Sequence, residues 1–157
     1  MEFQQNCTPQ QALSKAKNYC AYQERCHSEV KEKLYGFGLN KMEVDDLVSN
    51  LIEAGYLNEE RFAVSYAGGH FRIKKWGKLK IAYSLKQKQV SVYCINKALQ
   101  QIEEEDYLKT LQKLFDEKLK MLGKEKNAYH KKKKLQEYLF RKGFEIDLIR
   151  EMCESLT

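Results

Sequence analysis

The feature that most constrains the fold of this 157-residue chain is a spacing of apolar residues that occurs three times. When Leu34, Leu85 and Leu139 are aligned, apolar residues coincide four positions before them and five, ten, thirteen, fourteen and seventeen positions after them. The last four offsets follow the i, i+3, i+4, i+7 pattern of an amphipathic helix, and the first lies one helical turn before the leucine. Each copy therefore contains two successive helices, which is typical of a tandem helical array.

The residues between the two helices of each copy favour a tight turn. Gly38 and Gly143 stand four positions after the aligned leucine, where a residue in the left-handed region ends a helix at little cost. Gln89 holds this position in the second copy, and a residue other than glycine there costs roughly 1 kcal/mol. We therefore expect the second turn to be built differently. Two positions later, Asn40 and Ser91 are good N-caps for the next helix.

A further helix can be placed before each pair. Thr8 is followed by proline and then by a glutamine at the third helical position, while Asn58 and the acidic pair Glu105 and Asp106 start the corresponding helices in the later copies. The inner faces of these helices are expected to include Leu13, Ala16 and Cys20 in the first copy, Phe62, Tyr66 and Ile73 in the second, and Leu108, Leu111, Leu114, Phe115 and Leu122 in the third.

These patterns predict an all-α protein of three tandem three-helix repeats, at residues 8–56, 57–104 and 105–157. The chain has only 8 glycines and 1 proline, so the many tight turns of a β-sandwich are not provided for. A unit of about 50 residues buries too little surface to be stable alone, so each repeat should pack on its neighbours. We expect an elongated, curved helical stack.

Charge is strongly segregated along the chain. Residues 61–102 carry nine basic and no acidic side chains, and aromatic residues lie between the cations. Such a segment attracts a polyanion, so we expect contact with nucleic acid or an acidic protein surface. The alternative is that Phe71 and Trp76 are core residues and the lysines only keep the helix soluble; for the lysine run near residue 130 a solvated helix face is the simpler interpretation. The candidate binding residues are Arg72, Lys74, Lys75, Lys78, Lys80, Lys86, Lys88, Lys131, Lys132, Lys133 and Lys134.

No pattern indicates catalysis or a bound metal. The sequence has no nucleophile elbow, no glycine-rich phosphate loop and no zinc-protease motif, so we predict a protein that is not an enzyme and needs no cofactor. Cys20, Cys26 and His27 could ligate a metal, but a fourth ligand is missing, and buried reduced thiols are the preferred interpretation of the five cysteines. The carboxylates of residues 103–106 fit the start of a helix better than a magnesium site.

No apolar run reaches the roughly 18 residues needed to span a bilayer. The first twenty residues also lack the cationic start and apolar stretch of a secretory signal. We therefore expect a cytoplasmic protein that makes no membrane contact.

Three stretches in order resemble the successive motifs of the RecX family, which regulates the bacterial RecA recombinase. They are Arg25 to Leu34, then Gly55-Tyr56-Leu57-Asn58-Glu59-Glu60-Arg61-Phe62-Ala63, then Arg72 followed by Gly77-Lys78-Leu79-Lys80-Ile81. The resemblance covers about residues 12–105, and its most specific part is the stretch that begins at Gly55. The chain departs from the family pattern at Asn58, where aspartate is usual, and at Gln89, where the turn glycine is usual.

The resemblance implies a protein that binds the RecA filament on DNA, lodges in its groove and restrains filament growth, ATP turnover and strand exchange. It also implies binding of single- or double-stranded DNA, and we expect a monomer. The alternative is a small architectural or transcription protein that binds DNA without RecA. Within the motif we expect Tyr56, Leu57, Phe62 and Ala63 to pack between the first two repeats, whereas Arg61 either pairs with Asp45 or Asp46 or contacts a partner.

Overall fold

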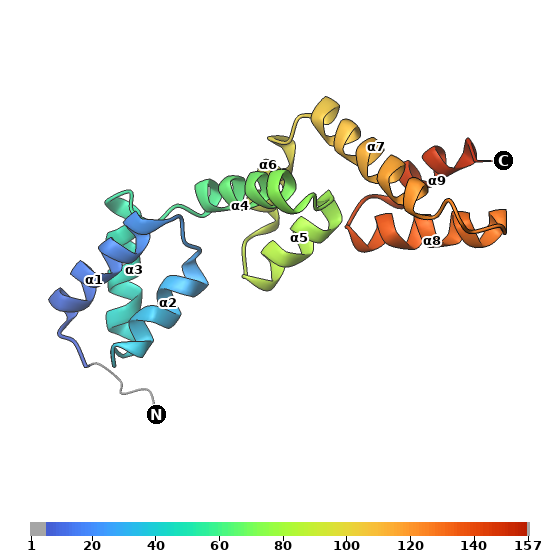
Figure 1. Ribbon diagram of the computed structural model, residues 1–157. Helices are drawn as coiled ribbons and strands as arrows, with labels where there is room; N and C mark the ends of the chain where they lie inside the picture. Colours follow the sequence, from blue (N-terminus) through green and yellow to red (C-terminus); the bar gives the residue numbers. More distant parts are fainter. Residues whose placement is uncertain (1–5, 157) are drawn as a thin grey trace. The chain divides into compact units, whose positions relative to one another are not determined.

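The computed structural model describes residues 6–156, which form helices and no strands (Figure 1). None of the helices in this part of the chain is both long and apolar enough to cross a lipid bilayer. The predicted all-α fold is therefore confirmed. The helices are α1 (Pro9–Tyr22), α2 (His27–Gly36), α3 (Lys41–Glu53), α4 (Glu59–Lys74), α5 (Lys78–Gln87), α6 (Val92–Gln100), α7 (Glu104–Met121), α8 (Ala128–Arg141) and α9 (Ile146–Glu154).

The helix ends follow the capping residues read from the sequence. The Thr8 hydroxyl accepts from the Gln11 N–H and the Gln11 side chain accepts from the Thr8 N–H, which completes a capping box at α1. Asn40 and Glu43 form the same pair at α3, and Asn58 Oδ1 accepts from the Arg61 N–H at 2.8 Å at α4. Capping by these short polar side chains explains why the breaks between helices fall where they do.

The repeated apolar positions form the core in every copy. Leu34, Leu85 and Leu139 are fully buried, and the residues four positions before them and five and ten positions after them are buried as well. The spacing therefore predicted the interior faces of six helices correctly. The residues concerned are Val30, Leu39 and Val44 in the first copy, Ile81, Val90 and Ile95 in the second, and Leu135, Phe144 and Ile149 in the third.

All three turns use the left-handed backbone region, including the one that lacks glycine. Gly38 and Gly143 have φ of 86° and 98°, and Gln89 has φ of 63°. The expectation that the second turn would differ was wrong. The +4 position takes this conformation in each copy, and the buried Leu85 and Val90 on either side of Gln89 hold the turn in spite of the steric cost of its side chain.

Two residues expected on inner faces are exposed. Ile73 is 81% exposed, because α4 buries Phe62, Ala63, Ala67 and Phe71, and residue 73 lies about 200° around the helix from residue 71. In α7, Leu108 is 41% exposed and Tyr107 is buried in its place. Tyr107 and Leu108 lie on neighbouring faces of α7, and the tyrosine takes the inner one, where its hydroxyl finds hydrogen-bond partners in the Lys78 N–H and Glu145.

The chain forms two compact units that cut across the repeats. One takes in the described residues up to Ser65 together with Leu85–Lys97; the other takes in Tyr66–Ser84 and the described residues from Ala98 on. Helices α4, α5 and α6 each continue from one unit into the other. The division into repeats at 8–56, 57–104 and 105–157 therefore stays a prediction based on sequence.

In the first unit, α1, α2 and α3 enclose a core that includes Ala16, Leu34, Leu51 and Leu57. Phe62 and Ala63 of the RecX-like motif are also buried, and Tyr56 packs against the core. In the second unit, α7, α8 and α9 enclose the other core, and Tyr107 lies between Phe71 and Phe144 with ring centroids 5.8 and 5.1 Å away. These rings join α4 to the third repeat.

Candidate functional site: a cationic junction around Trp76

Trp76 lies in the short loop between α4 and α5, at the centre of the predicted basic segment. The indole is partly exposed, and its centroid is 4.8 Å from that of His70, whose ring stacks on Tyr66 at 3.8 Å. The Nζ atoms of Lys74 and Lys80 lie 5.1 and 4.8 Å from the Trp76 centroid, within the range of cation–π attraction. Helix α4 and the loop after it therefore carry a row of three aromatic rings. Two ammonium groups lie beside the last ring, Trp76.

The third repeat adds cations to the same place. Lys142 Nζ donates to the backbone carbonyl of Lys74 at 3.3 Å, and Lys80 Nζ donates to the backbone carbonyl of Arg141 at 3.4 Å. Arg141 and Lys142 were not among the candidate residues in the sequence. Their signal was the glycine at residue 143, which permits the turn after α8 to lie directly on the start of α5.

Backbone contact between these two segments fixes the geometry. A Cβ atom on Gly77 would fall well inside van der Waals distance of the backbone of Gly143, and a Cβ atom on Gly143 would lie 2.7 Å from the backbone nitrogen of Lys80. The Gly77 and Leu79 N–H groups donate to the carbonyls of Lys142 and Gly143 at 2.7 and 2.9 Å. The carbonyls of the two residues after α8 thus accept from N–H groups just before and within the first turn of α5, where the N–H groups of a helix have no partners within it.

Tyr107 links the start of α5 to the residues just before α9. Its hydroxyl accepts from the Lys78 N–H at 3.0 Å and donates to the Glu145 carboxylate. Burial, followed by the hydrogen bond to Glu145, raises the pKa of Tyr107 far above the usual value for a phenol. The Lys78 ammonium lies 4.7 Å from the Tyr107 centroid. The group stays protonated and acts as a structural link.

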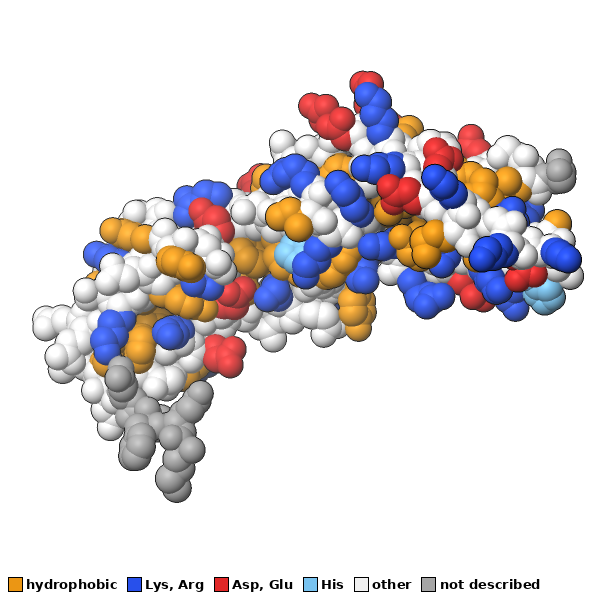
Figure 2. All heavy atoms as spheres, viewed as in Figure 1, with side chains coloured by type: hydrophobic (Ala, Val, Ile, Leu, Met, Phe, Trp, Pro, Cys, Tyr) orange, Lys and Arg blue, Asp and Glu red, His pale blue; other side chains and the backbone are white. Residues whose placement is uncertain are grey.

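The cations of this junction have no carboxylate partners. Within residues 6–156, no Asp or Glu oxygen lies within ion-pair distance of Arg72, Lys74, Lys75, Lys78 or Lys80, or of Arg141 and Lys142. Lys75 instead donates through Nζ to the Arg72 carbonyl at 2.7 Å and itself has a φ of 58°. We define the cationic junction as Arg72, Lys74, Lys75, Trp76, Lys78, Lys80, Arg141 and Lys142. On the face drawn in Figure 2, Lys and Arg side chains gather over the region where the end of α4 and the start of α5 meet α8.

The remaining predicted cations are placed differently. Lys88 pairs with Glu29 at 3.4 Å and belongs, with Lys86, to the first unit. Lys131 to Lys134 lie in the first half of α8, about 10 Å or more along the helix from Arg141. Lys134 pairs with Glu125 at 2.9 Å, and this contact lowers the pKa of Glu125. Within the second unit, the structure thus brings together Arg72, Lys74, Lys75, Lys78 and Lys80, and Lys131 to Lys134 lie apart from them.

Arg61 has a partner that the sequence did not indicate. Its Nε donates to Glu24 at 2.5 Å, and its terminal nitrogen donates to the Gly55 carbonyl at 3.0 Å. The prediction of a pair with Asp45 or Asp46 was wrong, because the side chain reaches back to the loop between α1 and α2. Arg61 therefore fastens α4 to the first repeat.

The cysteines proposed as alternative metal ligands have other surroundings in the structure. Cys26 Sγ lies 3.1 Å from both Ser28 Oγ and Glu29 Oε1, and burial raises the pKa values of Cys20 and Cys26. Across the described part of the chain, no three His, Cys, Asp or Glu side chains lie close enough together to hold a metal ion. The five thiols are unpaired, and all but Cys7 are buried.

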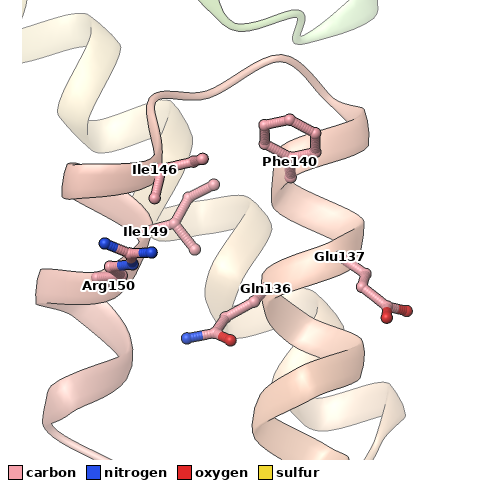
Figure 3. Close-up of a pocket in the computed structure, with 6 residues that line it drawn as sticks. All are labelled: Gln136, Glu137, Phe140, Ile146, Ile149 and Arg150. Atoms are coloured by element: carbon pink, nitrogen blue, oxygen red, sulfur yellow. The ribbon is translucent and has the colours of Figure 1, made fainter.

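One further hollow lies on the outside of the third repeat. A pocket of about 240 Å³ is lined by Phe140, Ile146 and Ile149, with polar groups at its rim. Figure 3 shows Gln136 pointing towards Arg150 of α9 and Glu137 pointing away from it. The pocket holds no pair of groups arranged for acid–base chemistry. The one sequence feature that could have indicated this pocket is Phe140, a large apolar residue directly after the aligned leucine.

The fold and the junction define a class of protein: a tandem array of three-helix domains with an unpaired cationic surface where two domains meet. The family model for the second three-helix domain of RecX matches residues 58–99, and that for the third three-helix domain of RecX matches residues 104–152. Together these matches cover more than half of the chain. The chain belongs to the RecX family.

Curated relatives agree with this assignment. The chain is 29% identical over 153 residues to the regulatory protein RecX of Bacillus cytotoxicus, covering 94% of this chain and 54% of the relative. It is 29% identical to RecX of Bacillus mycoides and 28% identical to RecX of Bacillus thuringiensis over the same shares. The chain therefore spans about half the length of the curated relatives it matches.

Solved structures support the fold. The crystal structure of RecX from Lactobacillus salivarius superposes with a TM-score of 0.85 at 22% identity, covering 94% of this chain and 96% of the other. A second crystal structure, of a regulatory protein RecX, gives a TM-score of 0.80 at 22% identity and covers 94% of this chain and 73% of the other.

Proposed function

We propose that this protein binds the RecA filament on DNA and restrains RecA-driven recombination and ATP turnover. Membership of a family of regulatory proteins supports this role, and the observation that carries it is the cationic junction. The junction holds seven cations from two repeats, two of them within cation–π range of one indole, and none of the seven has an ion-pair partner in the described chain. A RecA filament on DNA is a polyanion, and such a surface meets it through counterion release.

We infer that the protein acts by occupancy and without chemistry of its own, as a monomer in the cytoplasm. Tyr107, whose pKa is raised by burial, is used to hold helices together. Lys86, Lys88 and Lys131 to Lys134 would add attraction outside the junction. Residues Gly55, Tyr56, Leu57, Arg61, Phe62 and Ala63 contribute by fixing the start of α4.

The test is a titration of RecA's ATP hydrolysis on single-stranded DNA. Inhibition is expected at amounts well below one protein per RecA protomer, and it should weaken steeply as salt rises. The variant with Arg72, Lys74, Lys75 and Lys78 replaced by alanine should inhibit at least roughly tenfold less, since each neutralised phosphate contributes to the salt-dependent affinity. A variant with Lys109→Ala and Lys113→Ala on the exposed face of α7 is the matched control and should inhibit as the parent does.

The second candidate is a DNA-binding protein that works without RecA, and the same unpaired cations favour it. The two functions separate in this titration. A mere competitor for DNA must coat the lattice, so its inhibition would need near-stoichiometric amounts and would disappear when the DNA is in excess. Unchanged inhibition by the fourfold alanine variant would remove the junction from either mechanism.

A further inference from the structure

Trp76 is the only tryptophan of the chain and is placed where a ligand's ring could meet it. It lies at the end of the row formed by Tyr66 and His70, and it is neither buried in a core nor fully exposed. An indole needed only for packing would be expected inside one of the apolar clusters. Here Phe71 and Tyr107 fill the nearby core, and Trp76 lies beside the cations.

We propose that the cationic junction is a binding site for single-stranded nucleic acid, in which one base stacks on Trp76 and the flanking phosphates contact Lys74, Lys80, Arg141 and Lys142. This inference rests on the proposed function and names the component of the filament that the junction contacts. The site is composite, because the indole comes from the loop after α4 and two of its cations come from the end of α8.

The aromatic ring decides between nucleic acid and an acidic protein surface. Carboxylates would satisfy the ammonium and guanidinium groups, but they would gain no contact from the indole. A base offers a flat π-face to the indole while its phosphates reach cations a few ångströms away. In a duplex the faces of the bases are covered by their neighbours, so this contact selects a strand whose bases are unstacked.

The two lysines near the indole can also move aside when a base binds. Lys74 and Lys80 lie within cation–π range of Trp76, but exposed ammonium groups have flexible stems and form charge-assisted hydrogen bonds with phosphate readily. A bound strand would draw both ammonium groups from the ring to its phosphates, and the base would take their place. Stacking of a base on an aromatic side chain outweighs an exposed cation–π contact.

Because there is one tryptophan, its fluorescence reports directly on the site. The intact protein is titrated with a short oligothymidylate, with an abasic strand of equal length and with poly-glutamate, and binding is followed separately by competition against a dye-labelled strand. Oligothymidylate should quench the tryptophan emission. The abasic strand should bind roughly ten times more weakly and leave the emission nearly unchanged, because it offers phosphates without a base. Equal affinity for both strands, or equal competition by poly-glutamate, would overturn the inference.

Two variants test the composite geometry without emptying the core. Trp76→Phe keeps an aromatic ring of smaller stacking area, and Arg141→Gln removes one cation with an exposed side chain. Each should weaken oligothymidylate binding about three- to tenfold. Lys109→Gln, a change to an exposed lysine paired with Glu105 on α7 of the same unit, is the control and should bind as the parent does. Arg141→Gln behaving like this control would show that the third repeat adds nothing to the site.

The outcomes separate this inference from the proposed function. A protein that inhibits RecA but shows neither quenching nor a preference for bases would keep the proposed function and lose the site for a strand. Quenching by oligothymidylate without inhibition of RecA would keep the site for a strand and reject the proposed function.

Discussion

The N–H group of Gly77 donates a hydrogen bond of 2.7 Å to the carbonyl oxygen of Lys142. These two residues belong to neighbouring repeats, and Lys142 stands three positions after the aligned leucine of its own copy. The equivalent residue of the second repeat is Lys88, whose carbonyl accepts from the Ser28 hydroxyl at 2.9 Å. The second and third repeats therefore each dock through the same carbonyl on the repeat before.

The equivalent carbonyl of the first repeat is satisfied as well. Phe37 holds this position, and its carbonyl accepts from the Cys7 N–H at 3.0 Å. The residues just before α1 thus make the contact to this carbonyl that α2 and the residue before α5 make in the other two copies.

Gly77→Ala should strongly destabilise the joint between the second and third repeats. The new methyl group would overlap the backbone of Gly143, which cannot move as a side chain can. We expect a loss of about 3 kcal/mol in the free energy of unfolding, at the upper end of the range for overpacking. Urea unfolding followed by the fluorescence of neighbouring Trp76 measures it.

Gly69→Ala is the matched control for this change. Gly69 lies within α4 and has open space where a Cβ would stand. Alanine there should raise stability by about 0.5–1 kcal/mol because of its better helix propensity. If both alanine variants were equally stable, steric contact at Gly77 would not be what holds the joint.

Tyr107→Phe should lower stability by about 1–3 kcal/mol, because it leaves the Lys78 N–H and the Glu145 carboxylate without their buried partner. Tyr129→Phe changes an exposed tyrosine of α8 and should have little effect. A loss of the same size in both variants would contradict a specific role for the Tyr107 hydroxyl.

The contribution of this hydroxyl should depend on pH in one direction. The pKa of Tyr107 is raised in the folded protein, so the folded state keeps a proton that the unfolded state releases. The stability difference between the parent and Tyr107→Phe is therefore complete below about pH 10, the ordinary phenol pKa, and shrinks as pH rises above it. Denaturant unfolding of both proteins at pH 8, 10 and 11 checks this.

The repeat is the part of the structure that sequence could predict. The apolar residues around Leu34, Leu85 and Leu139 have the period of an amphipathic helix. Because packed helices bury their apolar faces, the core residues could be predicted from this period. The left-handed φ of Gln89 was also predictable from its position in the repeat, although not from its residue type. Position within a repeated fold outweighed the local preference of glutamine.

The cationic junction could be predicted only in part. The cations from Arg72 to Lys80 are neighbours along one stretch of chain, so their density was visible. Arg141 and Lys142 reach them through a contact between two turns more than sixty residues apart, which depends on how whole repeats dock. Lys131 to Lys134 were more conspicuous in the sequence, yet they lie near the start of α8, away from Arg141 at its end. The charge of a run does not indicate where its helix packs.

Gln89→Gly should stabilise the protein. The side chain of Gln89 is exposed and its φ of 63° is strained for any residue other than glycine, so its removal should gain about 0.5–1 kcal/mol. Gln87→Gly, two residues earlier at the end of α5, is the control and should lose about the same amount through poorer helix propensity. Thermal unfolding of the two variants beside the parent gives the comparison, and a Gln89→Gly protein less stable than the parent would mean that the glutamine side chain is needed in the turn.

The five thiols should differ sharply in reactivity. Cys20, Cys26 and Cys153 are buried and their pKa values are raised chiefly by that burial, so little thiolate is present near neutral pH. Cys94 is also buried, whereas Cys7 is partly exposed, with the Lys15 ammonium 3.5 Å from its sulfur. In native protein at pH 8, a disulfide reagent such as Ellman's should modify one thiol well before the other four, and Cys7→Ser should remove that fast phase alone. A fast phase that survives in Cys7→Ser would show that one of the helical cores opens readily, and that the buried thiols report local unfolding.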